Sequence, residues 1–257
     1  TLDMKGNTLS GKGYGYYGII NVGGGSLSVR GQGTVTVFYI GLTCNRGTLA
    51  VDGIIFNLTG DGRYEAEYGV ANKGGFVTLN NVKMSGASTG QVCHYSGDTT
   101  INNVTTTDSQ GTQYGPTYCG VYYQGESGTL TINGGTFDKI VVESDNYGGV
   151  QSVAELLGEG CAYKKQDGTW ATADDLAAME ISNVTVEKIP LTINPQGDTS
   201  WYYSTQQTHM LSMNAAPVDS SDSVAYVWKN GTETLDCSED ACTVPADTPV
   251  GSYTYTC

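Results

Sequence analysis

The sequence predicts an all-β protein whose strands repeat along the chain as a solenoid. The chain has 257 residues with 36 glycines, 18 tyrosines and only 15% charged residues, a composition typical of short strands joined by tight turns. A short apolar motif ending in Gly or Asn recurs six times. The strand before it returns after 23, 28, 22, 29 and 29 residues, and repeats of this length are typical of solenoids.

The recurring motif has an apolar residue, here called the anchor, followed two positions later by a corner residue. In GTLTINGGTF, residues 128–137, Ile132 is the anchor and Gly134 the corner residue. The six anchors are Val29, Val51, Leu79, Ile101, Ile132 and Ile181. The six corner residues are Gly31, Gly53, Asn81, Asn103, Gly134 and Asn183. Gly and Asn tolerate a left-handed backbone, so we expect the corner residues to stack in one column.

The strand before each corner carries an apolar mark that we expect to be buried. The marks are Ile19, Leu42, Val70, Val92, Val121 and Val150. Two residues further on stand Asn21, Cys44, Asn72, His94, Tyr123 and Ser152. Several of these are polar, which predicts a polar ladder at an inner corner rather than a catalytic histidine.

The unit L-x-I-x-[NG]-x-x-F, with a Gly-Val strand before it, resembles the right-handed parallel β-helix of pectate-lyase-like proteins. The resemblance covers residues 1–190 and implies a right-handed parallel β-helix in which each coil buries its apolar stripe on the next. A β-sandwich of short strands is the alternative, since it also produces turn signals at short spacing.

An insertion at residues 151–178 interrupts the sixth repeat. VAELLGEG is helix-like, and Thr172 or Asp174 could cap a second short helix in TADDLAAM. The stretch LLGEGCAYKKQDGTW resembles a segment of long Gram-positive surface proteins with β-helical arrays. We expect the insertion to act as a lid over the open end of the solenoid, because exposed end strands invite aggregation.

Residues 191–257 lose the period. AYVWKNG with Trp228, a C-x4-C pair and GSYTYTC together resemble bacterial immunoglobulin-like modules, which implies a C-terminal β-sandwich. The match lacks a cysteine on the expected B strand around residues 209–213 and stops at Cys257, so we expect an incomplete module. Cys237 and Cys242 are close enough to bridge a turn. Cys44 and Cys119 each lie two residues from a buried mark and are expected to be unpaired core thiols on the inward side of their strands.

The net charge and the motifs of the chain argue against several classes of function. A net charge of −14 with only 12 basic residues argues against nucleic acid, and no apolar run is long enough to insert into a membrane. The cysteine spacings match no zinc or redox motif, so we expect no metal and no cofactor. Two acidic groups, Asp61 with Glu65 and Glu67, and Asp138 with Glu143 and Asp145, are interpreted as solvated loops; no catalytic residue is predicted.

Tyrosines form the candidate ligand site. Tyr16, Tyr39, Tyr118 and Tyr147 each precede a mark by three residues, and Tyr95 and Tyr122 occupy neighbouring outward positions. Stacked coils would align these six rings into an exposed column that suits a protein or a sugar partner. The alternative is that the rings stack only to stabilise the sheet.

The resemblances together imply a non-catalytic binding or adhesion domain of a secreted, cell-wall-attached bacterial surface protein. Its ligand would be a host protein, such as an immunoglobulin, or a host glycan. Free thiols in a secreted protein predict an environment with little oxygen, and the resemblance to Gram-positive surface proteins implies a Gram-positive source. A β-helical glycosidase or polysaccharide lyase is the alternative. The chain begins mid-pattern at Thr1, and we therefore expect it to be a fragment of a longer protein.

Overall fold

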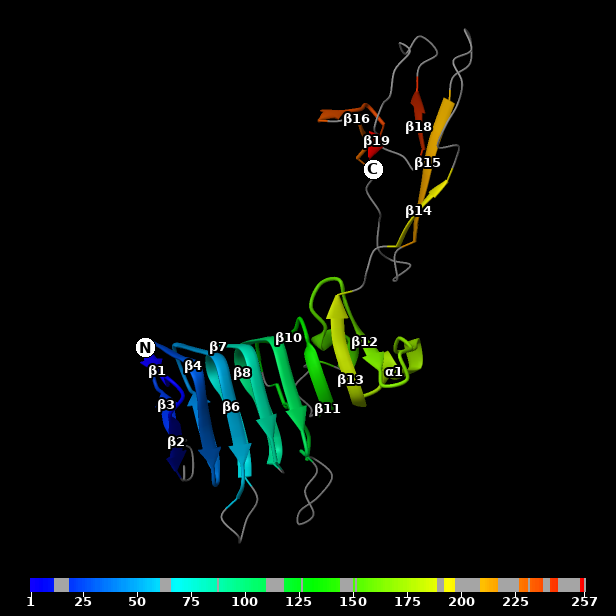
Figure 1. Ribbon diagram of the computed structural model, residues 1–257. Coiled ribbons are helices and arrows are strands. Elements are labelled where there is room, and N and C mark those ends of the chain that lie inside the picture. Colours follow the sequence, from blue (N-terminus) through cyan, green and yellow to red (C-terminus); the bar gives the residue numbers. More distant parts are fainter. Residues whose placement is uncertain are drawn as a thin grey trace. The chain divides into compact units, whose positions relative to one another are not determined.

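The chain divides into two compact units, Thr1–Lys188 and Ile189–Cys257. The computed structural model (Figure 1) describes residues 1–11, 19–60, 66–86, 88–109, 118–125, 127–143, 150, 152–188, 192–196, 209–216, 227–230, 232–237, 241–244 and 255–256. Tyr16 and Tyr147, together with Asp61, Glu65 and Asp145, lie outside the described residues.

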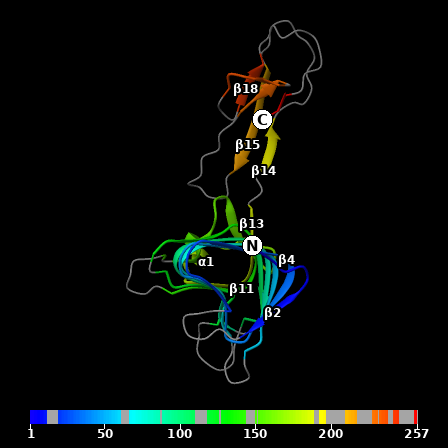
Figure 2. The same cartoon turned by 90° about the vertical axis from the view of Figure 1, so that its left-hand side faces the viewer.

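The first unit is built on a 13-stranded, mostly parallel sheet, so the prediction of an all-β protein is confirmed. Its strands stack as layers in Figure 1, and Figure 2, turned by 90°, looks along that stack. The strands are β1 (Leu2–Asp3), β2 (Thr8–Gly11), β3 (Ile20–Val22), β4 (Ser26–Val37), β5 (Ile40–Cys44), β6 (Thr48–Leu58), β7 (Ala66–Ser85), β8 (Ser88–Thr107), β9 (Val121–Tyr123), β10 (Thr129–Ile132), β11 (Gly135–Val142), β12 (Cys161–Lys165) and β13 (Glu180–Lys188).

The anchors form one buried column through the sheet. In register, Val29 lies beside Val51, then Leu79, Ile101 and Ile132 follow in successive layers, all fully buried. Leu2 in β1 starts this column one layer earlier. Each layer therefore buries its apolar residue against the same position of the next, which is how parallel layers share a core.

Ile181 does not extend this column, and its predicted place in the repeat is wrong. Strand β13 runs antiparallel to β11, which puts Ile181 beside Ile140. Leu157 of the insertion takes the sixth place, in an isolated parallel bridge with Ile132. The insertion reverses the chain, and a motif that only counts residues along the chain carries no information on strand direction.

Five of the six corner residues have a left-handed backbone. The φ angle is 83° at Gly31, 69° at Gly53, 52° at Asn81, 56° at Asn103 and 55° at Asn183. Gly134 is the exception, and the positive φ, 134°, falls on Gly135 instead. A Cβ on Gly135 would lie 2.1 Å from the carbonyl oxygen of Val104, so the backbone of the neighbouring layer requires glycine at that position.

The marks of the second to fifth repeats align as predicted, whereas Ile140 rather than the sixth mark, Val150, lies beside Val121. Leu42, Val70, Val92 and Val121 stack in register. In the first repeat, Ile20 rather than Ile19 lies beside Leu42. A one-residue shift exchanges the two faces of a strand, so Asn21 leaves the inner column and Val22 joins it.

The insertion packs into the same core as the repeats. It contains a 3-10 helix η1 (Val153–Leu156), strand β12 and helix α1 (Ala173–Ala177). Val153, Leu156 and Tyr163 are fully buried in the main cluster. Thr172 caps α1 as predicted, accepting a hydrogen bond from the Asp175 amide in a capping box. In Figure 1, β12, β13 and α1 lie at the end of the strand stack.

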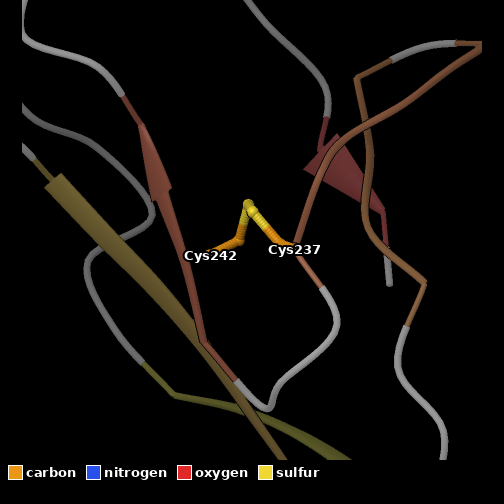
Figure 3. The surroundings of a disulfide bond; sticks show 2 residues. All are labelled: Cys237 and Cys242. Carbon is orange, nitrogen blue, oxygen red and sulfur yellow. A yellow bond between two sulfur atoms is a disulfide. The ribbon is translucent and has the colours of Figure 1, made fainter.

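The second unit contains two small antiparallel sheets. One has the order β14 (Thr192–Gln196), β15 (His209–Ala216), β18 (Ala241–Val244), and the other β17 (Glu233–Thr234), β16 (Lys229–Asn230), β19 (Tyr255–Thr256). A disulfide joins Cys237 to Cys242, the pair that the spacing allowed (Figure 3). Trp228 is buried, at 3% exposure.

Candidate functional site

The described tyrosines of the predicted column do not form an exposed row. Tyr118 and Tyr122 are buried, at 7% and 4% exposure, so the expectation that they face solvent is wrong. Tyr39 and Tyr95 are half-buried. The rings that a ligand could reach among the described members of the column are therefore those of Tyr39 and Tyr95.

A second, smaller core explains the burial of Tyr122 and the partial burial of Tyr39 and Tyr95. It lies on the other side of the β5, β7, β8 and β9 strands from the main core, since register and alternation place its residues opposite the inward marks. Ala71, Cys93 and Tyr122 stack there in successive layers. The full cluster comprises Ile40, Tyr68, Ala71, Cys93, Cys119 and Tyr122, with Tyr39, Tyr95 and Val141 packed against it. Alternation identified the outward side correctly, but it could not show that this side is itself covered.

Tyr68 and Tyr95 form the most polar part of this second core. Their rings meet edge to face with centroids 5.8 Å apart. The Lys73 ammonium lies 5.2 Å from the Tyr68 ring centroid and 5.7 Å from that of Tyr95. Burial is the main cause that raises the pKa of both phenols, so both stay protonated and keep their hydroxyls as hydrogen-bond donors. Rings with polar ends beside a cation suit recognition of a polar ligand.

The described thiols outside the disulfide are free and buried, at Cys44, Cys93, Cys119 and Cys161. The prediction that Cys44 and Cys119 are unpaired is therefore confirmed. Cys44 lies in the main core, whereas Cys119 lies in the second core rather than on the expected inward side. Burial raises the pKa of the Cys44, Cys93 and Cys119 thiols. A protonated, buried thiol is a poor nucleophile, which removes these three as catalytic groups.

His94 belongs to a buried polar network. Its Nδ1 lies 3.0 Å from the Thr99 hydroxyl, which also accepts a 3.0 Å hydrogen bond from the Asn72 side chain. The imidazole stacks on Tyr123, with centroids 5.0 Å apart and planes 9° from parallel. Burial lowers the pKa of His94 to about 4, so the ring is neutral at physiological pH. Asn72 and His94 thus provide the polar contacts predicted for the inner corner.

Asp138, which was interpreted as part of a solvated loop, lies instead in strand β11. The Asp138 carboxylate accepts hydrogen bonds from the Thr106 hydroxyl and the Ser109 amide, each 2.7 Å long. It therefore ties β11 to the end of β8. In the described part of the chain no three His, Cys, Asp or Glu side chains gather as they would around a metal ion.

An open groove lies between the β12 turn and the start of β13. It is lined by Lys165, Gln166, Asp167, Asp175, Glu180, Ile181, Ser182 and Asn183. Its acids have partners: Asp175 pairs with Lys165 at 2.5 Å, which lowers the pKa of that carboxyl to about 2, and Glu180 pairs with Lys139 at 3.0 Å. This groove could not be predicted from the sequence. Residues 165–167 lie beside residues 180–183 only because the chain reverses its direction at β13.

Comparisons with known proteins identify no relative of this chain. No family model, no curated protein and no solved structure matches the chain. Among the described residues, no helix has the length and apolar character needed to cross a membrane.

Proposed function

We propose that the chain is a binding domain of a bacterial cell-surface protein, with a right-handed parallel β-helix in the first unit and an immunoglobulin-like module in the second. Continuous parallel register over five anchor layers supports the β-helix. Two antiparallel three-stranded sheets and the buried Trp228 support the module. Its location is extracellular, at the cell wall.

The observation that favours binding over catalysis is that the reactive side chains in the described residues make contacts within the fold. The thiols of Cys44, Cys93 and Cys119 are buried and protonated, His94 is a neutral core residue, and Asp138 is held by neighbouring strands. Such groups stabilise the fold, and a rigid layered fold presents a large, fixed surface to a partner.

The proposed contact surface is the tyrosine face. Tyr39 and Tyr95 supply its accessible rings, and Tyr122 supports them from within the second core. Tyr118 is buried and belongs to the same proposal. Tyr16 and Tyr147, outside the described residues, belong to the same proposal. Half-buried tyrosines lose little conformational entropy on binding and are enriched at interfaces, whether the partner is a host protein such as an immunoglobulin or a host glycan.

The test combines capture from host secretions with a host glycan array. Replacing Tyr39 and Tyr95 together with alanine should weaken capture at least tenfold, which is about 1.4 kcal/mol. Met179→Ala is the matched control, since Met179 is 39% exposed and lies outside the tyrosine face. Full capture by the folded double variant would contradict the proposed surface. Release of sugar products on the array would instead favour a glycosidase or lyase.

A further inference from the structure

A second outward surface lies on the strand segments that precede the corners. These segments are residues 26–30 of β4, 48–52 of β6, 76–80 of β7, 98–102 of β8 and 129–132 of β10, and they pair in unbroken parallel register. Alternate residues, such as Val51, Leu79 and Ile101, are fully buried. The intervening residues therefore point outward from a regular sheet face.

Small polar residues dominate this face. One column is Ser28, Ala50, Thr78, Thr100 and Thr131, and the column before it is Ser26, Thr48, Phe76, Asp98 and Thr129. The third column is Arg30, Asp52, Asn80 and Asn102, followed by Asn133 directly after β10. Only Arg30, Asp52 and Asp98 are charged in these columns.

The polar groups of the face are held at fixed positions. Asn102 donates a 2.9 Å hydrogen bond to the Asn80 side chain, and Asn133 donates one of 2.8 Å to Asn102. This amide ladder fixes the planes of the three side chains. Beside it, the hydroxyls of Thr78, Thr100 and Thr131 make no hydrogen bond within the described part of the chain and are partly exposed. They are available to a ligand.

Phe76 stands out from this polar face. Its side chain is 59% exposed, more than any other large apolar residue in the described part of the chain. In register, its neighbours are Thr48 on one side and Asp98 on the other. A single exposed ring is ordinary by itself. A ring flanked by a hydroxyl and a carboxylate, with the hydroxyls of Thr78 and Thr100 on the same face, is a combination that suits a sugar, because the ring stacks on the pyranose face while polar groups bond its hydroxyls.

We propose that this face binds an uncharged, extended polysaccharide, with Phe76 as the stacking platform. Thr100 lies one layer further along and two residues from Asp98, and its hydroxyl would bond the next sugar. The layers repeat at about 4.8 Å, so a chain that crosses them meets similar polar groups at each step. Asp52, Asp98 and the net charge of −14 disfavour an acidic glycan. The site is separate from the tyrosine face and does not depend on it.

Affinity electrophoresis of the whole chain through gels containing galactomannan, mixed-linkage β-glucan or hyaluronan tests this proposal. We expect at least one of the two neutral polysaccharides to retard the protein and the acidic hyaluronan to have no effect. Phe76→Ala should weaken retardation at least tenfold, and Thr100→Val, which removes only a hydroxyl, should weaken it several-fold. Ile55→Ala is the matched control, because Ile55 is 45% exposed but follows the corner at Gly53.

Three outcomes would overturn the proposal. They are failure of both neutral polysaccharides to retard the chain, equal retardation of Phe76→Ala, and retardation by hyaluronan as strong as by the neutral polymers. Self-association in sedimentation that Phe76→Ala abolishes would make a second copy the occupant and also overturn it. The Tyr39 and Tyr95 double variant should keep its retardation, which separates this site from the proposed function.

Discussion

At the scale of single residues, asparagine has two roles at the corners of the layers. Asn103 adopts a φ of 56°, which non-glycine residues other than Asn and Asp rarely do. Its exposed amide also donates a 2.8 Å hydrogen bond to Asn81, and Asn81 donates one of 3.1 Å to Asp52. The corner thus combines backbone tolerance with a side-chain ladder between layers.

Replacing Asn103 with valine should lower the free energy of unfolding by about 1–2 kcal/mol, since a β-branched residue is strained in the left-handed region. Urea denaturation followed by circular dichroism measures the change. Asn103→Gly is the control: it keeps the backbone conformation and loses only the exposed hydrogen bond, so its loss should be smaller. Equal unfolding midpoints for valine and wild type would rule out strain at this corner.

His94 makes the stability of the first unit depend on pH. Burial lowers its pKa from 6.5 to about 4, so the folded state favours the neutral ring. Its contribution is complete above about pH 6.5 and is lost as the pH falls towards about 4. Between pH 7 and pH 4.5 the wild type should lose about 2–3 kcal/mol that a His94→Gln variant does not lose. Urea titrations at both pH values give this difference, and identical pH dependence in the two proteins would show that His94 does not titrate.

The corner residues could be predicted from the sequence because a left-handed backbone is a local requirement that favours Gly and Asn. Gly31, Gly53, Asn81 and Asn103 all have the left-handed φ expected of them. Gly134 failed because a second glycine follows it, and contact with Val104 of the neighbouring layer decides which of the two takes the positive φ. Ile19 failed for a similar reason, since two adjacent isoleucines offer two registers and only pairing with β5 selects Ile20.

At the scale of elements, Tyr163 of β12 fixes the insertion to the end of the stack. It is fully buried, and its hydroxyl donates a 2.9 Å hydrogen bond to the carbonyl of Val153 in η1. Burial raises the pKa of this phenol, which keeps the donor in place. One side chain therefore joins two parts of the insertion inside the main core.

Tyr163→Phe should destabilise the first unit by about 1 kcal/mol, the loss of one buried hydrogen bond. Tyr163→Ala should destabilise it by about 3–5 kcal/mol, since it also leaves a ring-sized cavity. Chemical denaturation of both variants measures the two effects separately. Equal stability of the alanine variant and the wild type would show that the insertion does not support the core.

The direction of strand β13 and the burial of outward-facing side chains could not be predicted from the sequence. MEISNVTV repeats the motif faithfully, and Asn183 even adopts the expected φ of 55°, yet β13 runs antiparallel. The corner signal is local, whereas strand direction depends on the path of the insertion. The same holds for the tyrosines, because alternation separates the two sides of a strand but does not show that a second core covers Tyr122.

At the scale of the whole molecule, the six cysteines that the structure describes divide into two chemical groups. Cys44, Cys93, Cys119 and Cys161 are buried thiols, and Cys237 and Cys242 form a disulfide. Thiol labelling read by peptide mass spectrometry should leave the first four unmodified in the native protein and label them after unfolding without reduction. Cys237 and Cys242 should be labelled only after reduction. Rapid labelling of Cys93 in the native state would contradict its burial in the second core.

The first unit holds both of its cores within its own residues, so it should fold without the second. Every member of the main and second clusters lies before Lys188, and the insertion supplies Val153, Leu156 and Tyr163 to the end of the stack. A chain of residues 1–188 should therefore melt cooperatively at the midpoint that the first unit shows in the full chain. Circular dichroism in the β-sheet region follows this transition.

The matched comparison is a chain of residues 1–150, which keeps the parallel layers but removes β12, β13 and the insertion. It leaves the edge of β11 unpaired and exposes the apolar column at Ile132 and Ile140, so it should aggregate or melt at a clearly lower temperature. Light scattering during the melt detects the aggregation. If residues 1–150 stay monodisperse and melt at the same temperature as residues 1–188, the insertion is dispensable and the closed end of the stack has no role in holding the layers together.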